Sequence, residues 1–216
     1  MQRVKSSFEL RAEAHQQALR ETIKNVCNLN QHEFDVTYDA ASVKGDNYTG
    51  ILYRIIVRDK QHRECLKIVV KLAPQNSARR EQFCVRPCFL RETQFYETIF
   101  QKYRQFQVEK GVDVETEGFH QVPKCYKSVS DELYEGIFLE DIKVSGFEMF
   151  NRFEKLTKDH VLIVLKTLAK FHAISFAIKD QNSEWMKPFS QMKDLFLERD
   201  GCLLYTSDAA DDLLCV

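Results

Sequence analysis

The sequence predicts an α+β fold, because segments typical of strands are followed along one chain by segments typical of helices. Between residues 32 and 72, apolar and polar residues alternate in three short runs, as they do in half-buried antiparallel strands. A long helical segment, two further strand candidates and a second strong helix come after them. The length of 216 residues allows one large domain or two lobes that share a cleft.

Each expected element has its own local signal. Residues 1–30 predict an opening helix with few apolar anchors. Alternating or β-branched runs predict five strands, at 34–38, 51–57, 66–72, 120–127 and 133–139. The polar segment 59–64 suits a hairpin turn. The other expected elements are a helix from residue 80 or 87 to 106, a loop at 107–119, a short helix or loop at 145–156 and a helix at 157–179. Thr157 is the expected N-cap of this last helix, with Asp159 in its first turn.

Composition excludes several classes of function. Lys and Arg number 31 against 32 Asp and Glu, a formal charge of -1, so no basic field favours nucleic acid or anionic lipid. The hydrophobic content of 44% is ordinary for a globular protein. Seven cysteines include no C-x-x-C pair, which excludes the zinc-ribbon and thioredoxin motifs. Nothing in the sequence indicates an obligate protein partner.

The expected compartment is the cytoplasm. Residues 1–20 contain no uninterrupted apolar core of the kind that secretory signals have. The most apolar stretch, residues 161–178, is interrupted by Lys166, Lys170 and His172. We interpret it as a buried helix and not as a membrane span.

A glycine-containing turn between the first two strand candidates is the first feature with functional meaning. Gly45, Asp46, Asn47 and Tyr48 are followed by Thr49 and Gly50. Backbone N–H groups in such a turn can approach a nucleotide phosphate, although an ordinary hairpin turn has the same composition. No Gly-Lys-Ser/Thr follows, so the turn is not a Walker P-loop.

A lysine and a glutamate carry the strongest chemical signal. Alternation places Lys71 and Val69 on the strand face opposite Val70, a pattern that by itself is typical of a solvated face. In the long helix, Glu92 begins a stripe of core-facing residues, Tyr96, Ile99, Tyr103 and Phe106. A carboxylate on a buried stripe needs a partner, and Lys71 is the nearest candidate in the chain. A strand Lys paired with a helix Glu holds the ATP phosphates in kinases. Glu97 falls off the stripe and is expected to be solvated.

The strand candidate at 133–139 leads into Glu140, Asp141 and Ile142. A connector that leaves a strand between two lobes can offer backbone donors and acceptors to the edge of an adenine ring. An ordinary acidic strand end is the alternative interpretation.

Five motifs occur in order: Gly45 to Tyr48, Val69 to Lys71, Phe89 to Tyr96, Leu139 to Asp141 with Gly146-Phe147, and Leu168 to Ser175. Together they resemble the ecdysteroid kinase-like family of insects, also called CHK kinase-like, within the choline/aminoglycoside kinase superfamily. The resemblance covers about residues 30–195. It implies a protein kinase-like fold, with an N-lobe of five antiparallel strands and a long helix, followed by a helical C-lobe.

The resemblance also implies an activity, the transfer of the ATP γ-phosphoryl group, with Mg²⁺, to a hydroxyl of an ecdysteroid or another lipophilic alcohol. Gly45, Asp46, Asn47 and Tyr48 would cover the phosphates, Lys71 would hold them, and Glu92 would fix Lys71. Val69 would lie over the adenine, and Glu140, Asp141 and Ile142 would form the hinge. His172 lies in a family motif, but its apolar helix favours a structural core histidine.

The catalytic loop of a kinase needs an Asp with an Asn five residues later, and a second Asp for the metal. After residue 140 the only asparagines are Asn151 and Asn182, and the residues five positions earlier are Gly146 and Ala177. We therefore expect no catalytic residues and no Mg²⁺ ligands in this chain, which by itself should be inactive.

The last residues, 201–216, resemble a translated sequencing-adapter tail, so Asp208, Asp211 and Asp212 are not taken as metal ligands. A native acidic C-terminus is the alternative. The gene beyond Asp200 distinguishes a truncated enzyme, which would continue into His-x-Asp-x-x-x-x-Asn, from a non-catalytic nucleotide-binding or interaction module. A choline or ethanolamine kinase is the other alternative.

The expected organisation has four parts: an N-terminal helix at 1–30, an N-lobe ending in the hinge at 31–142, the start of a helical C-lobe at 143–200 and a non-native tail at 201–216. The helix at 157–179 is apolar over most of its circumference. Such a helix suits burial in a larger helical lobe. Without the rest of that lobe, Val161, Leu165, Leu168 and Phe171 or their opposite-side neighbours should face water, which favours aggregation.

Overall fold

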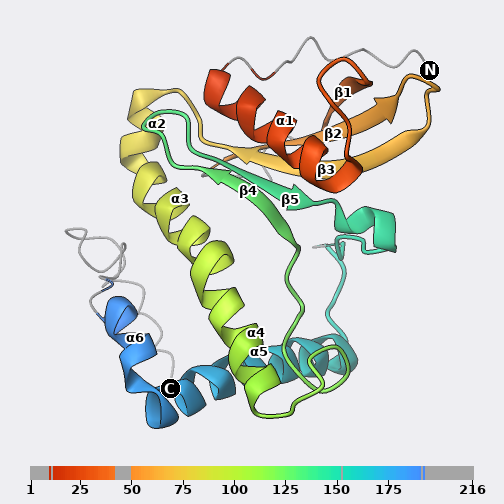
Figure 1. The fold of residues 1–216 in the computed structure, drawn as a ribbon. Coiled ribbons are helices and arrows are strands. Elements are labelled where there is room, and N and C mark those ends of the chain that lie inside the picture. Colours follow the sequence, from red (N-terminus) through yellow and green to blue (C-terminus); the bar gives the residue numbers. More distant parts are fainter. Residues whose placement is uncertain (1–9, 11, 42–49, 152, 191, 193–216) are drawn as a thin grey trace.

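A five-stranded antiparallel sheet with helices on both faces forms one half of the molecule, and a pair of helices forms the other (Figure 1). The structure is a computed structural model that describes residues 10, 12–41, 50–151, 153–190 and 192. The expected α+β class and the five antiparallel strands are confirmed.

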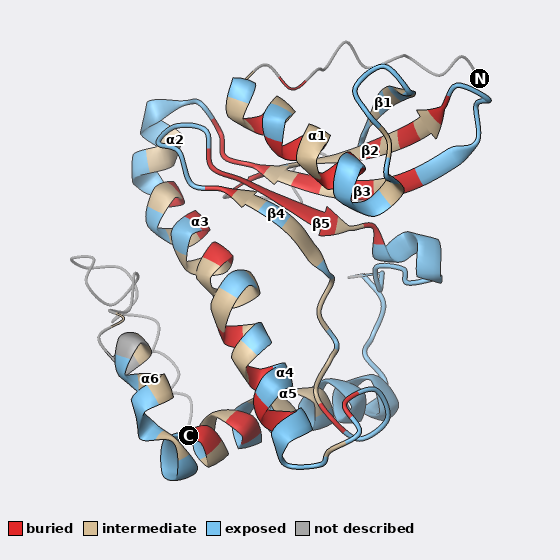
Figure 2. Ribbon diagram, in the orientation of Figure 1, coloured by how far each residue is buried: buried red, intermediate tan, exposed pale blue. Residues whose placement is uncertain are grey.

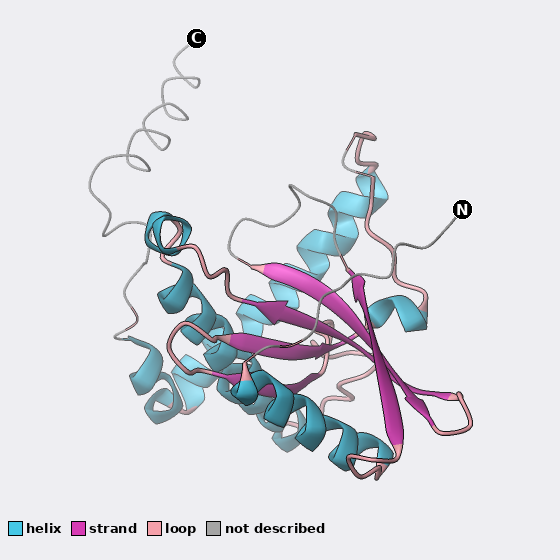
Figure 3. Cartoon of the chain, turned by 90° about the horizontal axis from the view of Figure 1, so that it is seen from above, coloured by secondary structure: helices cyan, strands magenta, loops and turns pink. Residues whose placement is uncertain are grey.

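The strands lie in the spatial order β1-β2-β3-β5-β4, and the twist of the sheet is visible from above (Figure 3). Their bounds are β1 Phe34–Ala40, β2 Ile51–Asp59, β3 Glu64–Leu72, β4 Cys125–Val129 and β5 Gly136–Glu140. All five overlap the segments predicted as strands, and each extends one to two residues beyond the predicted bounds. The central strand is β3, where Val69 pairs with Arg54 of β2 on one side and with Leu139 of β5 on the other.

Helix α1 (Glu13–Cys27) covers one face of the sheet. Leu19 and Ile23 are buried against the apolar row of β3, which includes Ile68 and Val70. This row is the one that strand alternation assigned to the core. The helix is shorter than the predicted range of residues 1–30, and residues 1–9 and 11 lie outside the described part of the chain.

His15 of α1 is buried and donates from Nε2 to the carbonyl oxygen of Tyr134 over 2.6 Å. Burial lowers the pKa of His15 below its ordinary 6.5, although the hydrogen bond to Tyr134 and the carboxylates of Asp131 and Glu135 oppose this shift. The unfolded chain therefore binds a proton at higher pH than the folded chain does. Stability from this histidine is complete above about pH 6.5 and declines as the pH falls below it.

We expect His15→Gln, which keeps a donor but does not titrate, to flatten the dependence of the unfolding free energy on pH between about 7.5 and 5.5. Urea denaturation at a series of pH values measures this slope. His32→Gln is the control, because His32 is exposed. Equal slopes in the wild type and in His15→Gln would show that His15 does not titrate differently on folding.

The opposite face of the sheet is covered by a helix that is less regular than predicted. The elements are α2 (Ser77–Gln82), α3 (Val85–Gln94), the π-helix η1 (Phe95–Ile99) and α4 (Phe100–Glu109). Cys84, which has a left-handed backbone with φ of 46°, separates α2 from α3, so a single helix from residue 80 is wrong and the observed start is close to the alternative at residue 87. The helix that carries Glu92 therefore begins at Val85.

The π-helix lets one continuous helix face two partners. Before it, Val85 and Phe89 of α3 pack against Ile137 and Leu139 of the sheet. After it, Tyr103 and Phe106 of α4 pack against α5, together with Ile99, the last residue of η1. A π turn inserts one additional residue, which rotates the following face relative to the preceding one.

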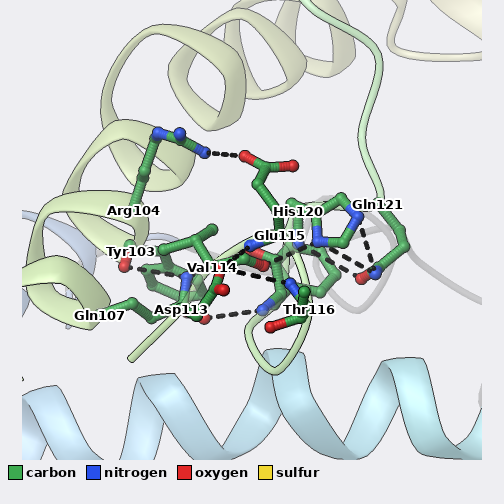
Figure 4. A network of polar contacts seen from close by, with 10 residues as sticks. Tyr103, Arg104, Gln107, Asp113, Val114, Glu115, Thr116, His120 and Gln121 are labelled. Carbon is green, nitrogen blue, oxygen red and sulfur yellow. Dashed lines mark hydrogen bonds and ion pairs between the residues drawn. The ribbon is translucent and has the colours of Figure 1, made fainter. Parts of the chain in front are cut away.

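The loop that follows α4 folds back on the helix through buried polar groups (Figure 4). The Gln107 amide donates to the carbonyl of Phe119, and the Phe119 N–H donates to Gln107 Oε1 over 2.6 Å. A Cβ on Gly118 would lie 2.8 Å from the Cα of Val114, so only glycine fits there. Arg104 and Glu115 form an exposed ion pair of 3.0 Å across the same loop.

The second half of the molecule begins after the 3₁₀-helix η2 (Ile142–Ser145) and consists of α5 (Lys158–Gln181) and α6 (Ser183–Ser190). Thr157 caps α5 and Asp159 lies in its first turn, as predicted. Most of α5 is exposed (Figure 2). Val161, Leu165 and Leu168 are 43%, 55% and 47% exposed, which confirms that they face water, whereas Phe171 packs among aromatic rings of α4 and its loop.

Two expectations for α5 were wrong. The helix was interpreted as buried, yet only 6% of its most apolar 18 residues are buried. By length and composition alone, α5 is the one helix of the described residues that could cross a membrane, a test that core helices of soluble proteins also pass. His172 is exposed instead of lying in a core, and it lines an apolar cavity of about 240 Å³ between α4 and α6.

Candidate functional site

The ion pair predicted between Lys71 and Glu92 is present. Lys71 Nζ lies 2.5 Å from Glu92 Oε2, and the two side chains are 20% and 30% exposed. Nζ also lies 5.3 Å from the centre of the Phe89 ring, one turn before Glu92 on α3. The lysine is therefore held by a charge and by an aromatic face, and it remains accessible to solvent.

Local structure explains how the two residues meet. Alternation along β3 turns Lys71 toward the α3 side of the sheet, and the buried side chains of Val85 and Phe89 hold α3 on that side. Glu92 follows Phe89 by three residues, so it lies on nearly the same helix face. Glu97 is exposed, as its position off the stripe predicted.

Gly50, directly before β2, lies against the side chain of Lys71. A Cβ built on this residue would be 3.0 Å from Lys71 Cε and 3.1 Å from Lys71 Cγ. Glycine thus leaves the space that the lysine side chain occupies. Gly45, Asp46, Asn47 and Tyr48, the turn predicted to cover phosphates, lie outside the described residues.

We expect Gly50→Ala to displace the Lys71 side chain at little cost in stability, because the atoms that would clash belong to a flexible side chain. If Lys71 binds nucleotide, ATP affinity should fall by a few-fold while the unfolding free energy changes by less than about 1 kcal/mol. Calorimetric titration and urea denaturation measure the two quantities. The same substitution in a Lys71→Met background should leave affinity unchanged, and an additive loss there would contradict this account.

The strand face around Lys71 is only half covered. Cross-strand pairing places Leu52 beside Lys71 and Arg54 beside Val69, and Val69 in turn lies beside Leu139. The side chains of Leu52, Arg54, Val69 and Lys71 are half-buried, and Leu139 is 9% exposed. Leu52, Val69 and Leu139 form an apolar surface between α3 and the end of β5. The charged residues Lys71 and Arg54 lie at its two ends. Val69 lies at its centre.

The end of β5 is tied to β2 by an ion pair that sequence analysis missed. Arg54 Nε donates to Asp141 Oδ2 over 2.5 Å, and the Asp141 side chain is only 3% exposed. Asp141 also accepts from the N–H of Lys143 over 3.3 Å at the start of η2. Its carboxylate is thus already occupied, so Asp141 can offer only its backbone to a ligand.

The two neighbours of Asp141 differ from it. Glu140 turns toward β4, where Oε2 accepts from the N–H of Lys124 over 3.1 Å. Ile142 is 39% exposed at the beginning of η2. Of the three predicted hinge residues, Ile142 therefore presents the most accessible surface.

A second group missed by sequence analysis is Glu135, with Arg80 and Arg86 around it. Glu135 is 1% exposed although it is a charged residue, and the two arginines lie on different helices. Neither pairing follows from periodicity, because each depends on how loops bring distant segments together. The only signal in the sequence was a pair of arginines beside the start of the long helix.

Burial also affects a phenol and a thiol near Glu92. It raises the pKa of Tyr96 to about 12, with a smaller contribution from the Glu92 carboxylate. Burial raises the pKa of the Cys88 thiol as well. Both groups are neutral at physiological pH, so they add no charge beside Lys71 and Glu92.

The chain was compared with protein-family models, with curated proteins and with solved structures. Residues 44–202 match the model of the ecdysteroid kinase-like family. Neither the curated proteins nor the solved structures gave a match. The matched range includes the Lys71–Glu92 pair, the end of β5 and the whole of α5, and it exceeds half of the chain, so the protein belongs to the ecdysteroid kinase-like family.

Proposed function

We propose that this chain carries the nucleotide-binding lobe of an ATP-dependent phosphotransferase whose acceptor is a hydroxyl of a small molecule. Membership of the family supports a small-molecule kinase-like phosphotransferase in general terms. The observation that carries the assignment to particular residues is the Lys71–Glu92 ion pair beside a half-covered apolar strand face.

In this proposal each group has a separate task. Lys71 Nζ donates to phosphate oxygens and offsets their charge, and Glu92 keeps the ammonium group at that place. Val69, Leu52 and Leu139 contact the adenine ring, while the backbone of Glu140 to Ile142 recognises its edge. Gly45 to Tyr48, which lie outside the described residues, are assigned to cover the phosphates, as the resemblance to the family implies. ATP supplies the γ-phosphoryl group.

Magnesium ions accompany ATP in phosphoryl transfer. Among the described residues, no three His, Cys, Asp or Glu side chains gather in a way that could hold a metal ion. We therefore assign no residue of this chain to Mg²⁺ and derive no step through it.

The proposed acceptor is an ecdysteroid or another lipophilic alcohol, with choline or ethanolamine as the alternative. In domain terms, residues 31–142 form the nucleotide-binding lobe and residues 143–200 begin a helical lobe, in a protein of the cytoplasm. A second candidate is a nucleotide-binding module without catalysis. The observation in its favour is that no Asp after residue 140 is followed by Asn five positions later.

Calorimetric titration of the 216-residue chain with ATP and Mg²⁺ tests the proposal. We expect saturable binding that weakens in Glu92→Gln, because this variant leaves Lys71 without its carboxylate. Incubation with ATP and an ecdysteroid, followed by mass spectrometry of the steroid, tests transfer. Because this chain contains no catalytic loop, binding without transfer agrees with both candidates, which the gene beyond Asp200 distinguishes, and the absence of binding would refute both.

A further inference from the structure

Glu135 is a fully buried carboxylate held by two arginines. Its side chain is 1% exposed, Arg80 Nη2 lies 2.9 Å from both of its oxygens, and Arg86 Nη1 lies 2.9 Å from Oε1. Arg80 is 10% exposed and Arg86 is 36% exposed. A carboxylate at this depth is stable only with such partners, so the cluster fixes the relative positions of the segments that contribute to it.

The backbone of Glu135 connects this cluster to the strand that carries the lysine. Glu135 directly precedes β5, and its carbonyl accepts from the N–H of Ala73 over 2.9 Å. Ala73 follows the last residue of β3, two positions after Lys71. In the sheet, Ile137 of β5 pairs directly with Lys71. Glu135 and Lys71 therefore belong to one hydrogen-bonded unit.

Arg86 connects the same carboxylate to the helix that carries Glu92. Arg86 lies in the first turn of α3, and Glu92 follows six residues later, about 9 Å along the helix axis at 1.5 Å per residue. Arg86 also donates to the carbonyl of Ser130 over 3.1 Å. The N-terminal end of α3 is thus tied to the loop before β5 by one side chain with two anchoring contacts.

We propose that Glu135 is a positioning residue, which holds Glu92 at Lys71 by fixing α3 to the sheet through Arg86. The proposal rests on the proposed nucleotide-binding function. In this proposal the buried cluster of Glu135, Arg80 and Arg86 holds α3 in its position. The lysine–glutamate pair is then formed in the free protein and does not wait for a ligand or a modification to move the helix.

Arg80 provides a matched control within the same cluster. It contacts the same carboxylate and is more deeply buried, but it lies on α2, which the left-handed residue Cys84 separates from α3. Loss of Arg80 should reduce stability at least as much as loss of Arg86 does. Loss of Arg86 should affect Glu92 more.

The experiment compares Arg86→Met and Arg80→Met in the 216-residue chain. We expect Arg86→Met to weaken ATP binding by about tenfold, within the range common for coupling between sites. Arg80→Met should weaken it by less than about threefold while lowering the urea midpoint at least as far. Arg86→Lys, which keeps the charge, should recover part of the affinity. Equal losses of affinity in Arg86→Met and Arg80→Met would overturn the proposal, since they would reflect general loosening of the fold.

A second readout does not depend on nucleotide. Acylation of the Lys71 amine by an amine-reactive ester, followed by mass spectrometry, reports whether Glu92 still restricts access to Nζ. In Arg86→Met the rate at Lys71 should rise toward the rate in Glu92→Gln, and combining both substitutions should add little. A rate at Lys71 unchanged by Arg86→Met would overturn the positioning role. If the wild type failed to bind ATP while these rates behaved as expected, the proposed function would fail and the positioning role would stand.

Discussion

Glu135→Gln is expected to lower the free energy of unfolding by about 3 kcal/mol. The substitution removes the anion but not the two cations, and Arg80 is only 10% exposed. Removing one partner of a buried ion pair typically costs about 3–5 kcal/mol, because the remaining charge is left buried without compensation. The lower end of this range applies, since glutamine still accepts a hydrogen bond and Arg86 can reach solvent.

Urea denaturation of Glu135→Gln measures this loss, and Glu115→Gln is the matched control. Glu115 pairs with Arg104 at 3.0 Å, similar to the 2.9 Å of the Glu135 contacts, but its side chain is 64% exposed. The control should change stability by less than about 1 kcal/mol, as exposed ion pairs do. Similar losses of unfolding free energy in both variants would mean that burial does not strengthen the contribution of Glu135 to stability.

The same carboxylate should make the fold sensitive to acid. Burial alone raises the pKa of Glu135, but hydrogen bonds from Arg80 and Arg86 outweigh it and leave the pKa below its ordinary 4.5. Because the folded state holds the charged form more strongly, its contribution to stability is complete above about pH 4.5 and is lost as the pH falls through the lower folded value. Glu135→Gln should remove this part of the acid dependence in denaturation curves recorded below about pH 5.

Lys71→Met is expected to weaken ATP binding by about 10- to 100-fold, the effect of losing hydrogen bonds to a charged group. Any phosphate transfer should disappear with it. Stability should change little, because the partner Glu92 is 30% exposed and can be hydrated when the lysine is absent. Calorimetric titration with ATP measures the affinity.

Lys67→Met is the control for this prediction, because Lys67 lies on the same face of β3 and is paired with Glu64 at 2.6 Å. It lies four residues from Lys71 along the strand, about 13 Å at the usual rise of a strand. We expect Lys67→Met to bind ATP as the wild type does. Unchanged affinity in Lys71→Met, or equal losses in both variants, would refute the role assigned to Lys71.

The parts of the fold that sequence could predict depend on short-range periodicity. Alternation along 66–72 places Ile68 and Val70 on the core side and Lys71 on the other, and both placements are present in the structure. The stripe that begins at Glu92 led to its pairing with Lys71, because a strand and the helix that follows it are near neighbours in space. Thr157 was recognisable as a cap because capping is decided within one turn.

The missed features depend on contacts between distant segments. Arg54 and Asp141 are 87 residues apart in the sequence, and a charged residue at a strand end usually faces water. The break at Cys84 carries no glycine or proline at the left-handed position, so composition did not indicate it. α5 was interpreted as buried from its apolar composition alone, but burial requires a partner surface, and the described residues cover little of this helix.

The π-helix at Phe95–Ile99 makes the length of the α3–α4 helix a fixed quantity. Each residue of an α-helix turns the chain by about 100°, so one further residue inserted between Glu92 and Tyr103 would rotate Glu92 by roughly that angle relative to Tyr103. The helix could then face either β3 or α5, but not both. An insertion in the loop after α4 has no such effect, because a loop absorbs additional residues. The angular position of the carboxylate beside Lys71 is therefore set in part by residue counting between two packed layers.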